Sequence, residues 1–113
     1  TNCTLDSFCE MIARTAKLMG VSQIGIGSDL CQDQPDSVVE WMRVGRWTKD
    51  IDYGEGSAAN AGFPPMPSWF QDNRHFDAIA TGLHKQGFSQ ADVAGIMGDN
   101  WLNFYDASFG PAE

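Results

Sequence analysis

Apolar side chains near the amino end of the chain recur at every third or fourth position from Thr4 to Met19. This spacing places them on one face of a helix, and the set comprises Leu5, Phe8, Cys9, Ile12, Ala13, Ala16 and Met19. Thr4 is a suitable N-cap, and Gly20 stands where a helix often ends in a left-handed residue. The pattern therefore predicts a helix over residues 4–19.

After Gly20 the pattern changes to a short apolar run, Val21-Ser-Gln-Ile-Gly-Ile-Gly-Ser28. This run predicts a strand in which Ile24 and Ile26 share one face, while Gly25, Gly27 and Asp29 share the other. A helix, a glycine and an apolar strand in this order are typical of a βαβ unit. The predicted fold class is therefore α/β, with a parallel sheet and helices packed outside it.

Residues 31–75 differ from the segments around them, although Asp36 to Arg43 could form a short helix. Glycine and proline interrupt residues 45–73, which excludes one continuous element. The same segment is rich in aromatic side chains, namely Trp47, Tyr53, Phe63, Trp69 and Phe70. A long loop of this composition is predicted to be ordered against another surface.

Helical spacing returns over residues 76–86. Ser89 and Asp92 then form a capping-box pattern, which predicts a second short helix that ends at Gly98. Asp99 or Asn100 is predicted to cap a last helical turn that carries Trp101.

Composition limits the classes of function. The chain has 113 residues and a formal net charge of -8, and nucleic-acid binding is not expected because it relies on Lys and Arg to neutralise phosphates. No apolar run reaches the roughly 20 residues of a membrane-spanning helix, so no membrane span is expected in this segment. Three cysteines without a C-x-x-C pair predict neither a disulfide framework nor a structural zinc site, and they favour a cytoplasmic location.

Asp29 is the leading candidate for chemistry. It follows the expected strand, and ligands in α/β folds bind at the carboxyl ends of strands. The glycines below it, Gly25 and Gly27, would leave open volume beside its carboxylate. A carboxylate in this place can bind a metal ion, orient a substrate amine or transfer a proton. The alternative is that Asp29 only caps the turn after the strand.

Other polar and aromatic residues carry weaker signals. His75 and His84 form no recognised metal-ligand motif, so surface or packing roles are favoured for both. Trp47 either lines a substrate pocket above the strand end or packs within its loop.

Two segments of the chain resemble the membrane (renal) dipeptidase family, peptidase family M19 of the amidohydrolase superfamily. Gly20-Val-Ser-Gln-Ile-Gly-Ile-Gly-Ser-Asp29 is similar to the last barrel strand of that family. The family's ending is similar to four later blocks, which are Gly82-Leu83, Gln86-Gly87-Phe88-Ser89, Asp92-Val93 and Ile96-Met97-Gly98-Asp99-Asn100-Trp101. The blocks occur in the order in which the family has them.

The resemblance implies the C-terminal portion of a (β/α)8 TIM barrel. Residues 1–30 would supply a helix and the last strand, residues 31–75 an aromatic loop insert, and residues 76–113 the terminal helices. It also implies a metal-dependent dipeptidase, in which two zinc ions activate the water that cleaves a dipeptide. Asp29 would be the catalytic residue that handles the proton and binds the substrate amine, with Trp47 near the substrate. The zinc ligands are expected upstream, and none in this segment.

The length of the chain adds expectations about partners. A whole barrel needs roughly 250 residues, and the chain begins at Thr1 rather than Met. The rest of the barrel chain is therefore an expected partner, and the segment alone is expected to be inactive. A homodimer is also expected.

Departures from the family pattern leave an alternative open. Leu30, Cys31 and Gln32 follow Asp29 where the family has a second acid, and Gln23 stands where a histidine is frequent. These differences permit a non-catalytic barrel relative that acts as a binding or scaffold subunit. A small self-contained α/β domain is disfavoured, because a single strand would have no pairing partner in it.

Overall fold

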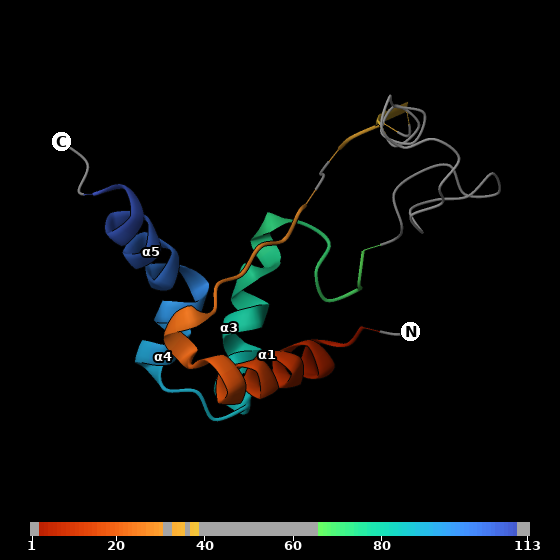
Figure 1. Cartoon of the computed structure of the whole chain (residues 1–113). Helices are drawn as coiled ribbons and strands as arrows, with labels where there is room; N and C mark the ends of the chain where they lie inside the picture. The colour runs from red at the N-terminus through yellow and green to blue at the C-terminus, as the bar shows by residue number, and fades with distance from the viewer. Residues whose placement is uncertain (1–2, 31–32, 36, 39–65, 111–113) are drawn as a thin grey trace, which may run out of the picture. The chain divides into compact units, whose positions relative to one another are not determined.

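The computed structural model describes residues 3–30, 33–35, 37–38 and 66–110. The chain divides into two compact units, Thr1–Asp29 with Pro67–Glu113, and Leu30–Met66. The first unit holds the elements described below (Figure 1): α1 (Leu5–Met19), η1 (Val21–Gln23), η2 (Asn73–His75), α3 (Phe76–Lys85), α4 (Gln90–Ala94), η3 (Gly95–Asp99) and α5 (Asn100–Phe109). In the second unit, the described residues include a turn in which the Val38 N–H donates to the Pro35 carbonyl at 2.9 Å.

The prediction of an α/β fold is wrong. The described part of the chain is helical and contains no β-strand. Val21–Gln23 forms a 3-10 turn, and only from Ile24 (φ -113°, ψ 132°) does the backbone run extended. An extended segment becomes a strand through hydrogen bonds to a neighbouring strand, and the described residues provide no such neighbour. The chain is therefore not the C-terminal portion of a (β/α)8 barrel.

Helix α1 confirms the prediction made from its apolar stripe. Thr4 is the N-cap, and it forms a capping box with Ser7: the Ser7 N–H donates to Thr4 Oγ1 at 3.1 Å, and the Thr4 N–H donates to Ser7 Oγ at 3.0 Å. At the other end, Gly20 adopts φ 86° while its N–H donates to the Ala16 carbonyl at 2.9 Å. Glycine takes this backbone conformation without the steric cost that a Cβ brings, so the helix ends there.

The core of this unit lies where α1 packs against α3. Its buried apolar side chains come from both helices and from α4 and η3, and they include Cys9, Ile12, Ile79, Leu83, Val93 and Ile96. Gly82 permits the close approach of α1 and α3, because a Cβ on it would lie 2.5 Å from Cys9 Sγ. Burial raises the pKa of the Cys9 thiol, with a smaller contribution from Asp6. The thiol therefore stays protonated and packs as a small apolar group.

Aromatic residues just before α3 pack on the start of α1. The Trp69 ring lies 5.4 Å from that of Phe8 and 5.7 Å from that of Phe70, and Phe70 meets Phe76 edge-on at 5.1 Å. The Trp69 indole N–H also donates to the Cys3 carbonyl at 2.9 Å. The carboxyl-terminal end of the aromatic segment is thus held against a helix, as its composition predicts.

The capping box that the sequence predicts before α4 is present. The Asp92 N–H donates to Ser89 Oγ at 3.2 Å, and the Ser89 N–H donates to Asp92 Oδ2 at 3.1 Å. The prediction that Asp99 or Asn100 caps a new helix is wrong. Both residues have helical backbone angles, and η3, a single π-helical turn, passes into α5 without a break.

Helix α5 extends away from the α1 and α3 pair (Figure 1). One row of its side chains is aromatic, and every member is exposed; the row comprises Trp101, Phe104, Tyr105 and Phe109. Tyr105 stacks on Trp101 and on Phe109, whereas Phe104 meets Trp101 and Tyr105 edge-on. Among the described residues, no helix is both long enough and apolar enough to cross a membrane.

Asp72 begins η2 and has a shifted pKa. Hydrogen bonds from the Arg74 guanidinium, and then from the Arg74 backbone N–H, lower the pKa of its carboxyl to about 2. The folded-state pKa thus lies below the ordinary value of 3.8. The stabilisation from this contact is therefore present above pH 3.8 and is lost as the pH falls from there through about 2.

An NMR titration of the Asp72 carboxyl carbon is expected to have its midpoint at a pH of about 2. Arg74→Ala should raise that midpoint, because the largest cause of the shift is removed, whereas Arg14→Ala should leave it unchanged. A midpoint that does not respond to Arg74→Ala would contradict this account.

Candidate functional site

The candidate site is built around the extended segment after η1, which Asn100 holds in place. The Asn100 side-chain amide donates to the Val21 carbonyl at 2.9 Å and to the Ile24 carbonyl at 2.8 Å. Gly95 leaves room for that amide, because a Cβ on Gly95 would lie 2.9 Å from Asn100 Oδ1. One side chain at the start of α5 thus fixes both ends of the 3-10 turn that precedes the segment.

Trp101 covers one face of the extended segment. Its indole N–H donates to the Ile26 carbonyl at 3.2 Å, and its ring lies directly against Gly25, so that a Cβ there would collide with it. The expectation of open volume beside both glycines is therefore wrong at Gly25, where the indole fills the space. At Gly27 an added Cβ would meet no described atom within 4 Å.

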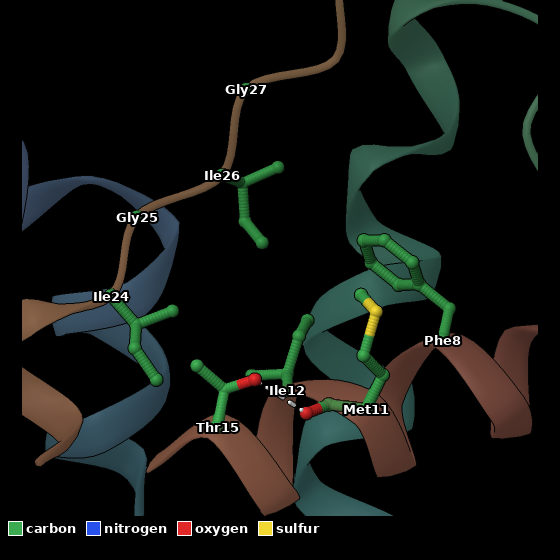
Figure 2. A pocket seen from close by; sticks show the side chains of 8 residues that line it. All are labelled: Phe8, Met11, Ile12, Thr15, Ile24, Gly25, Ile26 and Gly27. Carbon is green, nitrogen blue, oxygen red and sulfur yellow. Dashed lines mark hydrogen bonds between the residues drawn. The ribbon is translucent and has the colours of Figure 1, made fainter. Parts of the chain in front are cut away.

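The opposite face of the segment turns towards α1. Figure 2 shows Ile24 and Ile26 pointing at that helix, which confirms that the two isoleucines share a helix-facing side. Between them and α1 lies an apolar cavity of about 250 Å³, lined by Phe8, Met11, Ile12, Thr15, Ile24, Gly25, Ile26 and Gly27. Thr15 is the one residue of this lining with a polar side chain, and its hydroxyl donates to the Met11 carbonyl at 3.0 Å.

Asp29 lies exposed at the end of the segment, in the same compact unit as the cavity. Its backbone has φ 48°, in the left-handed region that few non-glycine residues adopt. Asp and Asn tolerate this conformation better than most residues. The extended run of the segment therefore ends at Asp29. Trp47, the other predicted site residue, lies outside the described residues and stays a prediction.

The described residues do not form a metal centre. No group of three or more His, Cys, Asp or Glu side chains that could hold a metal ion occurs among them. Both histidines bond locally: His75 Nδ1 accepts from the Gln71 and Asp72 N–H groups at 3.3 Å, and His84 Nδ1 lies 3.3 Å from the Phe88 carbonyl oxygen. The donor set at hand does not fit a two-zinc site, which needs several ligands from these residue types.

Sequence reasoning missed the roles of Asn100 and Trp101. A weak signal was present, because asparagine inside a helix is unfavourable and a polar side chain there often bonds elsewhere. The signal could not name the partners, which lie 79 and 76 residues away in the chain.

Asn100→Ala is expected to lower the free energy of unfolding by about 1–3 kcal/mol, because two hydrogen bonds are lost and the Ile24 carbonyl is left without its donor, whereas the Val21 carbonyl keeps the Ile24 N–H. Urea denaturation followed by circular dichroism measures the change. Asn103→Ala is the matched control, since Asn103 is exposed on the same helix and should change stability little. Equal losses in the two variants would contradict the anchoring role of Asn100.

Comparison of the chain with protein-family models, with curated proteins and with solved structures gave no match.

Proposed function

We propose that the chain forms part of a metal-dependent dipeptidase, with Asp29 as a catalytic residue. The observation that carries the proposal is that the two segments which resemble the dipeptidase family contact each other. Asn100 and Trp101, from the later segment, bind the carbonyls of Val21, Ile24 and Ile26 in the earlier one. Residues that are distant in sequence and resemble one family thus build one structural element, at the end of which Asp29 lies.

The chemistry of Asp29 suits a peptide substrate. Asp29 is exposed, so a substrate can approach this residue from solvent. A carboxylate accepts hydrogen bonds from the ammonium group of a dipeptide, and a carboxyl group can transfer a proton to the departing amine. We assign these two roles, amine binding and proton transfer, to Asp29.

Zinc is the metal that the resemblance implies, and the described residues do not fit a two-zinc site. The zinc ligands are therefore proposed to lie in polypeptide other than the described residues. We also propose that the protein is a homodimer, is located in the cytoplasm and takes a dipeptide as substrate.

Hydrolysis of alanyl-D-alanine by the complete protein that carries this chain tests the proposal. Amine release is expected, it should stop on treatment with 1,10-phenanthroline, and added zinc should restore it. Chelator-insensitive release would contradict a metal-dependent reaction. No release from a panel of dipeptides, with zinc bound, would contradict the dipeptidase.

A binding or scaffold subunit is the second candidate, and the aromatic row of α5 favours it. Exposed apolar patches of this kind mark interaction surfaces. Retained hydrolysis after Phe104→Glu, together with loss of hydrolysis after Asp29→Asn, would separate the enzyme from this alternative.

A further inference from the structure

Trp101 joins helix α5 to the extended segment that leads to Asp29. Its indole N–H donates at 3.2 Å to the carbonyl of Ile26, which stands three residues before Asp29. The ring of Tyr105 stacks on the indole, with ring centroids 5.9 Å apart and an angle of 22° between the planes. Side chains four residues apart on a helix are neighbours, so Tyr105 restricts the rotation of the Trp101 side chain.

Gly25 lets the indole approach the backbone of the segment. A Cβ at this position would collide with Nε1, Cε2 and Cδ1 of Trp101, the atoms around the N–H that binds Ile26. A Cβ at Gly27 would meet no described atom within 4 Å. Neither glycine has a positive φ, so the backbone accepts alanine at both positions. The two positions therefore differ in their distance from the indole.

We propose that Trp101 is a positioning residue for Asp29. It acts through the backbone, because it fixes Gly25 and Ile26 and thereby sets where the segment places the Asp29 carboxylate. Asn100 fixes the earlier part of the segment through the Ile24 carbonyl, so Trp101 is the nearer of these two contacts to Asp29. A group that transfers a proton must lie within hydrogen-bond reach of that proton, and a displacement of about 1 Å can cost about a hundredfold in rate.

This inference rests on the catalytic role proposed for Asp29, but its first test needs no hydrolysis. The chain has four tryptophans, and the indole N–H signal that Trp101→Phe removes from the NMR spectrum is that of Trp101. Gly25→Ala is expected to shift this signal upfield, because the displaced indole loses its hydrogen bond to Ile26. Gly27→Ala is the matched control and should leave the signal in place, since its Cβ would not reach the indole. Circular dichroism should show that both alanine variants fold.

The second test is hydrolysis of alanyl-D-alanine by the complete protein. Gly25→Ala is expected to lower kcat by about tenfold to hundredfold, because the carboxylate is misplaced. Trp101→Phe keeps an aromatic ring and loses the N–H, so it should lower kcat by about threefold to tenfold. In an Asp29→Asn background, Gly25→Ala should have no further effect on kcat, since residues that act as one unit are not additive. A purely structural role of Trp101 would instead lower kcat equally in both backgrounds.

An indole signal that Gly25→Ala leaves unshifted, or that both alanine variants shift equally, would overturn the contact between Trp101 and the segment. Unchanged kcat in Gly25→Ala would overturn the positioning role, and so would a loss of the same size with and without the Asp29 carboxylate. No hydrolysis by the complete protein would contradict the proposed function and the positioning role together, whereas the indole signal reports the contact separately. Failure of the dipeptidase and failure of the contact are therefore distinguishable.

Discussion

Asp29→Asn is expected to lower kcat for dipeptide hydrolysis by the complete protein by about 10²–10⁴-fold, the range that proton transfer by a positioned side chain contributes. Asparagine keeps the size of aspartate, but it cannot carry the charge that attracts a substrate ammonium group, nor can it transfer the proton. Steady-state kinetics with alanyl-D-alanine measure the loss.

Asp33→Asn is the control for this substitution. Asp33 is also exposed and also has a positive φ, 55° compared with 48° for Asp29. The two variants therefore share the chemical change and the backbone region, and only the Asp29 variant is expected to lose activity. Unchanged kcat in Asp29→Asn would remove this residue from the mechanism. A similar loss in both variants would point to a general effect of charge.

Leu83→Ala is expected to lower the free energy of unfolding by about 2–5 kcal/mol, the usual cost of truncating a leucine in a packed core. Leu83 is 0% exposed and lies in the layer between α1 and α3. The truncation removes apolar contacts and leaves a cavity. Neighbours such as Ile79, which lies on the same helix, are held in place by that helix and cannot move to fill it. Urea unfolding gives the free energy directly.

Leu18→Ala makes the same chemical change on the surface. Leu18 is 88% exposed, so its truncation should alter stability by less than about 0.5 kcal/mol. The difference between the losses of unfolding free energy in the two variants measures the contribution of burial, since both variants replace a helical leucine with alanine. If Leu18→Ala cost as much as Leu83→Ala, the described core would be misplaced.

Local signals predicted the helix ends. Thr4 with Ser7, and Ser89 with Asp92, are polar pairs three residues apart, and each pair closes a capping box. A bond between residues so close in sequence depends on one helical turn and on little else. The apolar stripe of α1 was predictable for the same reason, because helical period alone sets which side chains share a face.

Whether the predicted strand forms could not be decided from the local sequence pattern. Extended backbone at Ile24 follows from the residue itself and its neighbours, but a sheet needs a partner whose position no local pattern contains. Asp29 as a candidate site came from the same local pattern. Its exposed position and left-handed backbone came only with the structure.

The sequence by itself determined where α1 begins and ends, how α4 is capped, and that Ile24 and Ile26 share a face, since each depends on neighbours within a few residues. Only the tertiary structure decided that Trp101 fills the space beside Gly25 and that Asn100 holds the turn before it. These contacts join residues more than 70 positions apart. Packing of the helices brings such residues together, and no periodicity along the chain encodes that proximity.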